Sequence, residues 1–154
     1  MKVLGINLSH NASFSIVEKG NLLLSIEQER VSRRKRDNQV DKLCEKLKGS
    51  YFEIIGYTSF DMTDERLESD TNYIKHTLKK YNISFNKLIP YDEHHLTHCY
   101  SSFYNSGFEE AICLIVDNGG TSFIFDGNKY GQEVISIYKL SYNHEPILIY
   151  KLCK

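Results

Sequence analysis

The stretch KVLGINLSHNASFSIVE, residues 2–18, predicts how the fold begins. It opens and closes with short runs of β-branched and other apolar residues, KVLGINL and ASFSIVE, which favour β-strands. Ser9, His10 and Asn11 lie between these runs and are typical of a sharp turn. The stretch therefore predicts two paired strands, with His10 at the tip of their connection.

The pattern of elements continues as far as residue 90. A turn signal at residues 19–21 leads to a third strand at 22–26, which completes an antiparallel meander. The spacing of apolar residues then alternates between the helical and the strand period. It predicts a helix at residues 40–47, a strand at 51–59, a helix at 61–81 and a strand at 88–90. We expect the last two strands to join the meander in parallel, and the helices to cover the sheet.

A second informative stretch is DEHHLTHCYSSFY, residues 92–104. If it is helical, His94 and His98 lie one turn apart on the same face, so that both imidazoles can reach one metal ion. His95 then points elsewhere. The run AICLIV that follows is short and continuously apolar, which predicts a buried strand. Asp117 comes directly after this strand.

Two histidines and one aspartate form the ligand set expected of an octahedral iron or manganese site, or of a catalytic zinc site with an open position. The spacing is weak support by itself, because His-x-x-x-His without the intervening glutamate of the metalloproteases also occurs by chance on surface helices. At the level of spacing, a metal site and a solvated helix face both remain open.

Composition and charge exclude several classes of protein. The 154 residues include 19 basic and 20 acidic side chains, for a net charge of −1, which argues against a nucleic-acid-binding protein. The four cysteines form no C-x-x-C pair and the chain begins without an apolar signal segment, so we expect a reducing, cytoplasmic location. No apolar run approaches the ~20 residues of a membrane helix, so we expect no membrane partner.

The later part of the chain predicts a second meander. Asn118, Gly119 and Gly120 form a turn signal, and three strand patterns follow at residues 121–125, 134–140 and 147–152. The order β-β-β-α-β-α-β-α and then β-β-β resembles the superfamily of actin, sugar kinases and heat-shock chaperone ATPases, in which two ribonuclease-H-like halves enclose a nucleotide. We therefore expect an α/β fold: a ribonuclease-H-like subdomain with a mixed sheet at residues 1–110, and the opening meander of a second, incomplete one at 111–154.

In that superfamily the hairpin turn that opens each half faces the phosphates of the nucleotide. The corresponding turns would be Ser9 to Asn11 here, and Asn118, Gly119 and Gly120. Glycine would let backbone N–H groups approach an anion closely. Turns that only join two strands have the same composition, so this interpretation also remains open.

Three segments resemble the carbamoyltransferase family that includes antibiotic O-carbamoyltransferases and the nodulation-factor carbamoyltransferase. HHLTHCYSSFYNSGF followed by AICLIVDNGG resembles its metal-binding segment, VLGINLSHNASFSIVEKG its opening, and IEQERVSRRK its Glu-x-Glu-Arg-x-x-Arg-x-Lys segment. The segments occur in the family's order and cover nearly the whole chain. The chain departs from the family at Asn11, where aspartate is usual, at Asn118, where glycine is usual, and at Thr121, where glutamate is usual.

The resemblance implies transfer of a carbamoyl group from carbamoyl-adenylate to the hydroxyl of a small-molecule acceptor. Carbamoyl phosphate and ATP would form the adenylate in a carboxy-terminal domain. His94, His98 and Asp117 would bind a divalent metal, iron(II) by resemblance, and zinc or manganese would suit the same ligands. His10 and Lys35 match residues that look catalytic in the family: a histidine can accept the proton of the hydroxyl, and a lysine can stabilise charge on oxygen.

Family members are several times longer, so we expect this chain to be an amino-terminal portion that is inactive without the missing carboxy-terminal domain. The second meander would have no helix of its own, and its exposed apolar face should then drive association with another copy. The alternative is a non-catalytic metal- or nucleotide-binding module of the actin-like superfamily. Asn11 and Asn118 at the two turns suit that alternative, and Lys35 without the resemblance would be a solvated residue in a basic run.

Overall fold

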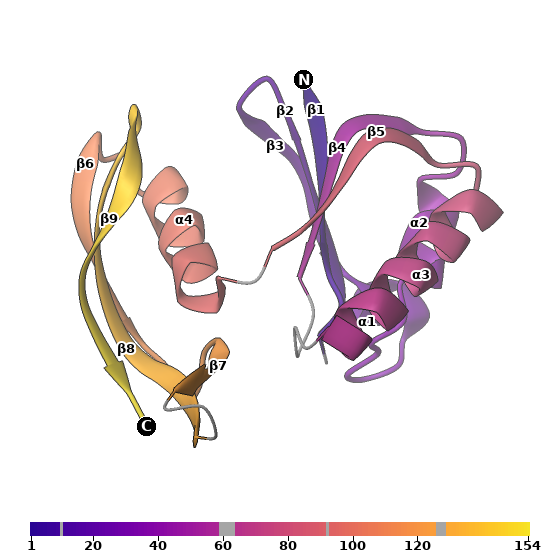
Figure 1. Cartoon of the computed structure of the whole chain (residues 1–154). Helices are drawn as coiled ribbons and strands as arrows, with labels where there is room; N and C mark the ends of the chain where they lie inside the picture. The colour runs from indigo at the N-terminus through magenta and orange to yellow at the C-terminus, as the bar shows by residue number, and fades with distance from the viewer. Residues whose placement is uncertain (10, 59–63, 92, 126–128) are drawn as a thin grey trace. The chain divides into compact units, whose positions relative to one another are not determined.

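The computed structural model describes residues 1–9, 11–58, 64–91, 93–125 and 129–154 (Figure 1). Backbone contacts divide the chain into two compact units, Met1–Asp92 and Glu93–Lys154. Within the described ranges, no helix combines the length and the apolar content that crossing a lipid bilayer requires.

The first unit is built on a five-stranded mixed sheet with the order β3-β2-β1-β4-β5. Antiparallel pairing joins β1 (Lys2–Asn7), β2 (Ser13–Glu18) and β3 (Asn21–Glu27), and parallel pairing adds β4 (Tyr51–Thr58) and β5 (Ser84–Pro90). A meander extended by two parallel strands in this order is a ribonuclease-H-like half. The expected α/β, actin-like fold class is confirmed, and β5 begins earlier than its sequence pattern indicated.

Three helices complete the first unit: α1 (Gln28–Ser32), α2 (Asp41–Lys46) and α3 (Asp64–Lys80). Figure 1 shows them gathered on one side of the sheet. The core between helices and sheet is apolar and almost fully buried, and its members include Leu4, Phe14, Phe52, Ile55, Val40, Leu43, Ile74 and Leu78. Because β-strand side chains alternate between faces, every second residue of β1 and β2 enters this core. The sequence pattern did not indicate the short helix α1, which lies in a highly charged stretch.

The described residues of the second unit form one helix and four strands, and all the strand pairs are antiparallel. Helix α4 (His94–Ser106) ends at Gly107, whose positive φ of 76° favours glycine. The strands are β6 (Glu110–Val116), β7 (Ser122–Phe125), β8 (Lys129–Ser141) and β9 (His144–Cys153). The long strand β8 pairs with each of the other three.

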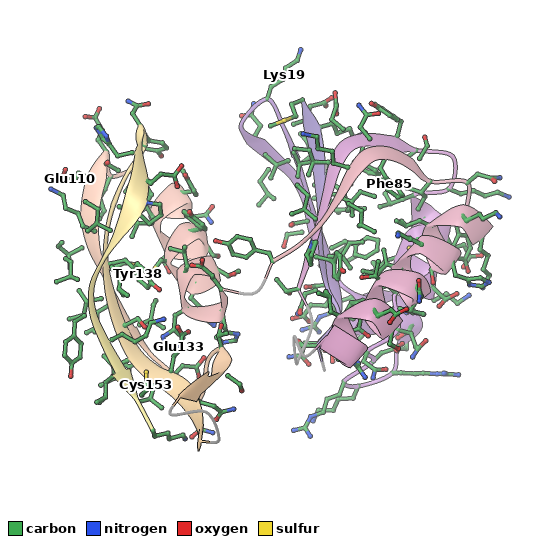
Figure 2. All side chains as sticks on the ribbon, in the orientation of Figure 1. Lys19, Phe85, Glu110, Glu133, Tyr138 and Cys153 are labelled. Carbon is green, nitrogen blue, oxygen red and sulfur yellow. The ribbon has the colours of Figure 1, made fainter. Side chains whose placement is uncertain are left out.

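Helix α4 packs on β6 and β8. Its apolar residues Leu96, Cys99 and Phe103 are buried together with Tyr138 and Leu140 of β8. Figure 2 labels Tyr138 among them. The expectation that the second meander has no helix of its own is therefore wrong. The boundary between the two compact units lies between residues 92 and 93, whereas the sequence pattern placed a subdomain boundary after residue 110. The two boundaries differ because α4 buries its apolar face in the second unit.

The opposite face of the second sheet is apolar and exposed. Strand register places Leu114 beside Ile137 and Tyr150, and Val116 beside Ile135 and Leu152. Leu114 is 60% exposed and Val116 70% exposed, far above the level of core residues. The prediction that the run AICLIV is a buried strand is therefore wrong for this face, because α4 covers only the other side of the sheet. No described element of this unit covers that face, so the expected exposed apolar surface is present.

We expect Asp41→Asn to destabilise the first unit. Asp41 begins α2, and its Oδ1 accepts a hydrogen bond from Lys80 Nζ of α3 at 2.8 Å. This hydrogen bond holds the pKa of Asp41 below its ordinary value. Since Lys80 is half exposed, solvent screening should limit the loss of unfolding free energy to about 1 kcal/mol at neutral pH.

The pH dependence of this loss follows from the sign of the shift. A lowered pKa in the folded state stabilises the protein above the ordinary carboxyl pKa near ~3.9, and this contribution disappears as pH falls through the lower folded value. The free energies of unfolding of wild type and D41N should therefore become equal in acid. Urea unfolding, monitored through amide signals of the first unit, measures both. Glu45→Gln, which removes an exposed pair with Lys42, serves as the matched control; an equal loss in E45Q would contradict the prediction.

We also expect the exposed sheet face to cause concentration-dependent self-association, which Leu114→Lys should weaken because a buried lysine charge is costly. Sedimentation velocity over a range of concentrations measures this. Ser101→Lys adds the same charge at an exposed site on α4 and should leave association unchanged. A wild-type chain that stays monomeric at every concentration would contradict the expectation.

Candidate metal centre

Helix α4 places two histidines on its exposed face. His94 is its first residue and His98 follows one turn later. The side chain of His94 is 47% exposed and that of His98 is 52% exposed. Leu96, which lies between them in the sequence, and Cys99, which follows His98, are buried against the sheet. The separation follows from helical periodicity, because residues four apart share a face and residues two apart do not.

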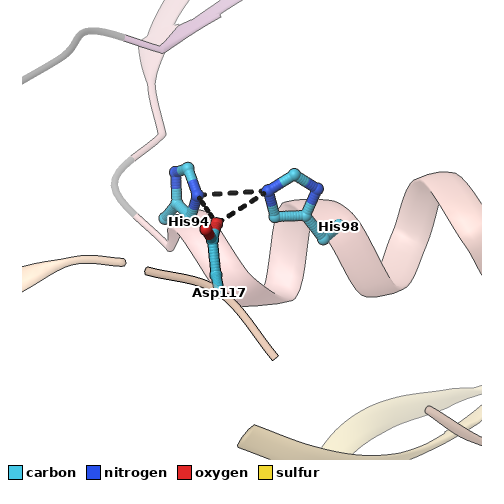
Figure 3. A group of neighbouring side chains, drawn as sticks. All are labelled: His94, His98 and Asp117. Carbon is cyan, nitrogen blue, oxygen red and sulfur yellow. Dashed lines mark hydrogen bonds and ion pairs between the residues drawn. The ribbon is translucent and has the colours of Figure 1, made fainter. Parts of the chain in front are cut away.

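Asp117 follows directly after β6. Its backbone N–H donates to the carbonyl of Val134 on β8 at 3.0 Å, which ties the residue to the sheet. Its Oδ1 accepts the N–H of Asn118 at 2.6 Å, so that one carboxylate oxygen is held by the turn. The other oxygen, Oδ2, points toward the two histidines (Figure 3).

The three side chains converge on one point (Figure 3). His94 Nε2 lies 2.9 Å from Asp117 Oδ2, and His98 Nε2 lies 3.1 Å from His94 Nε2 and 3.6 Å from Asp117 Oδ2. Bonds of about 2.0–2.2 Å to a metal separate neighbouring ligand atoms by about 3.0 Å in an octahedral site and about 3.4 Å in a tetrahedral one. The observed spacing therefore fits a common metal ion, and among the described residues these three form the one cluster that does so.

Electrostatics favour the ionised form of Asp117. The hydrogen bond with His94 is the largest cause of a pKa below the ordinary value, and the N–H of Asn118 acts in the same direction. Burial opposes these effects but is outweighed. The carboxylate is thus kept in the deprotonated form that a metal ligand requires.

A buried polar cluster lies behind the turn that carries Asp117. His95, on the inner face of α4, is fully buried, and its Nδ1 lies 2.8 Å from Ser136 Oγ on β8. Glu133, also on β8 and labelled in Figure 2, is 4% exposed and accepts a hydrogen bond from Lys151. The sequence patterns did not indicate this cluster, because its members come from three elements and share no local motif.

Glycine is required at position 120 by this cluster. A Cβ there would lie 2.7 Å from Glu133 Oε2 and 2.8 Å from His95 Nε2. Two N–H groups of the turn also have partners within the chain: that of Asn118 donates to Asp117 and that of Gly120 to the carbonyl of Glu133. Phosphate binding by Asn118, Gly119 and Gly120 therefore stays a prediction.

The remaining candidate residues belong to the first unit. Asn7 organises the connection after β1: its Oδ1 accepts the N–H of Ser9, and its Nδ2 donates to the carbonyl of Asn11, both at 3.1 Å. Lys35 lies in an exposed turn after α1. His10 lies outside the described residues. Their catalytic or phosphate-binding roles stay predictions.

Comparison with known proteins gives one sequence relative. No family model matches the chain. The "Uncharacterized protein MJ1051" of Methanocaldococcus jannaschii is 29% identical over an alignment of 142 residues, which covers 87% of this chain and 26% of the relative. The chain thus spans about a quarter of the length of that curated relative.

Solved structures resemble the backbone at low identity. YeaZ from Pseudomonas aeruginosa is 10% identical, with a TM-score of 0.45 over 99% of this chain and 66% of that one. A structure described as a candidate N-acetylglucosamine kinase from Porphyromonas gingivalis is 7% identical, with a TM-score of 0.41 over 99% of this chain and 47% of that one.

These comparisons overturn the expected carbamoyltransferase identity. That identity depended on three short segments, and none of the proteins named above is described as a carbamoyltransferase. The segments consist of a strand turn, a charged stretch and a histidine pair, which one fold can carry for many activities. The description that stands is an actin-like, ribonuclease-H-like domain. Carbamoyl transfer, its adenylate intermediate and its hydroxyl acceptor lose the support that the resemblance supplied.

We expect Gly120→Ala to destabilise the second unit by about 1–3 kcal/mol, the usual cost of forcing an extra methyl group into packed atoms. Gly119→Ala is the matched control, because the nearest atoms to a Cβ at position 119 belong to the side chain of the exposed Gln132, which can move. Urea unfolding followed by amide signals of the second unit compares the two. Equal effects of the two substitutions would show that the His95–Glu133 packing does not constrain the turn.

Proposed function

We propose that this chain is a divalent-metal-binding module with the actin-like fold, and that His94, His98 and Asp117 are the ligands. The supporting observation is the convergence of three potential ligand atoms within 4.8 Å of one another. Imidazole suits zinc, iron and other transition metals, and one carboxylate supplies the negative charge that a cation attracts. The proposal takes its ligands from a single compact unit, so it needs no assumption about the other.

Proton counting favours a metal over a simple hydrogen-bonded cluster. The Nε2 atoms of His94 and His98 lie 3.1 Å apart, and both approach Asp117 Oδ2. When each ring is neutral, Nε2 carries either one hydrogen or one lone pair. Two Nε2–H groups could both donate to Asp117 Oδ2 but would face each other across 3.1 Å, and a single Nε2–H could not donate to both of its neighbours. A cation accepts a lone pair from all three atoms at once.

The exposure of the ligands determines what the ion can do. Three protein ligands with half-exposed histidines leave coordination positions open toward solvent, as catalytic rather than structural zinc sites do. A bound ion would act there as a Lewis acid or as a template that orients an anionic or carbonyl group. The fold itself names no substrate, since one architecture supports many activities.

We expect tag-free protein to bind about one equivalent of Co²⁺ or Zn²⁺. Isothermal titration calorimetry gives the stoichiometry, and the visible absorption of Co²⁺ reports its coordination. Asp117→Asn and His98→Ala should each weaken binding at least about 100-fold, because loss of a direct ligand costs no less than loss of its supporting partner. Binding should release protons in acid, where the ligands must first be deprotonated.

His76→Ala is the matched control, because His76 is an exposed histidine on α3 outside the cluster. Its removal should leave the affinity unchanged. The proposal fails if the wild-type chain binds neither ion, or if the D117N and H98A variants bind as tightly as wild type. In that case the three side chains form a surface hydrogen-bonded cluster without a metal.

A further inference from the structure

A buried carboxylate holds the turn that carries Asp117. Glu133 on β8 is 4% exposed, and its Oε2 accepts the backbone N–H of Thr121 at 3.3 Å. Its Oε1 accepts a hydrogen bond from Lys151 on β9. A buried charge persists only when it is paired and hydrogen-bonded, and Glu133 satisfies both conditions. Its position is therefore strongly determined by its surroundings.

Thr121 connects this carboxylate to the start of α4. Its Oγ1 accepts the backbone N–H of His94 at 3.1 Å. The residue before the helix, Glu93, makes no side-chain capping bond. A hydroxyl from a distant part of the chain thus satisfies one of the N–H groups that every helix leaves without an intrahelical partner. Thr121 is held by Glu133 through its backbone and holds His94 through its side chain.

The neighbouring residue of β8 holds the other end of the turn. Asp117 donates its N–H to the carbonyl of Val134, and Gly120 donates to the carbonyl of Glu133. The space beneath is filled, since His95 lies against Gly120 and within 3.8 Å of Glu133. The turn from 117 to 121 therefore has little freedom to shift along α4.

We propose that Glu133 is the positioning residue of the metal site, which sets the distance between Asp117 and the two histidines through Thr121. This inference rests on the proposed function. Metal–ligand distances tolerate deviations of only about 0.2 Å, so a small displacement of the turn changes affinity. Residues that support ligands in this way typically change metal affinity by about 10–100-fold when they are altered.

The first test is Glu133→Gln. Glutamine keeps the size of the side chain and an oxygen that can accept the Thr121 N–H, but it lacks the charge that pairs with Lys151. Co²⁺ titration should show affinity about 10–100-fold below wild type and an altered visible spectrum. Glu110→Gln removes an exposed carboxylate of the same unit, on β6, and should bind Co²⁺ as wild type does.

The second test changes Thr121 and does not depend on how E133Q folds. Thr121→Val removes the hydroxyl at nearly constant shape, whereas Thr121→Ser keeps it. T121V should weaken Co²⁺ binding and speed hydrogen exchange of the His94 amide in the metal-free protein, and T121S should restore both. If Thr121 contributes only to stability, T121V should lower the unfolding midpoint without changing the affinity of the folded protein for Co²⁺.

The outcomes separate the two proposals. If wild type binds Co²⁺, and folded E133Q and T121V bind it equally well, the positioning role is wrong. If E133Q does not fold, the comparison of T121V with T121S decides alone. If wild type binds no Co²⁺, the metal assignment fails instead. The His94 amide exchange then still decides whether Thr121 fixes the start of α4: equal rates in T121V and T121S would overturn that link as well.

Discussion

The packing of α4 on β6 and β8 is the interaction on which the candidate metal centre depends. Burial of Leu96 and Phe103 contributes roughly 1.5–3 kcal/mol for each side chain, whereas an exposed pair such as His94 and Asp117 contributes about 0–1 kcal/mol. The apolar contacts therefore determine how the helix is rotated about its axis. His94 and His98 face Asp117 as a consequence of that rotation and contribute little to holding the helix in place.

The buried cluster behind the turn, formed by His95, Glu133, Ser136 and Lys151, fixes the position of the turn more precisely than apolar packing can. Burial acts to lower the pKa of Lys151, but the hydrogen bond and the charge of Glu133 outweigh it and raise that pKa, which favours the charged ammonium. Burial likewise lowers the pKa of His95, which favours a neutral ring, although the charge of Glu133 opposes it. The hydrogen bonds of His95 Nδ1 with Ser136 and of Glu133 with Thr121 and Lys151 restrict the arrangement of this cluster, because a displacement would leave these buried atoms without partners, as His95 Nε2 already is among the described residues.

The fold and the site carry different kinds of information about function. The mixed sheet of the first unit shows a ribonuclease-H-like architecture, yet that architecture is compatible with many activities. The carbamoyltransferase resemblance implied a complete reaction on the basis of short segments alone. Within the described part of the second unit, the geometry supports a narrower statement: three side chains, His94, His98 and Asp117, lie at metal-ligand spacing.

The sequence by itself determined most of the strands and longer helices and the exposed residues of the candidate metal centre, because both follow from local patterns. Runs of β-prone residues between turn signals predicted β1 to β4. The spacing of His94 and His98 predicted a shared helix face, and the end of an apolar run predicted the place of Asp117. Tertiary structure alone decided that α4 belongs to the second unit, because the choice depends on which distant surface buries its apolar face. It also decided the roles of His95, Glu133 and Gly120. These residues are separated along the chain, and only the pairing of β8 with its neighbours brings their atoms within a few ångströms of one another.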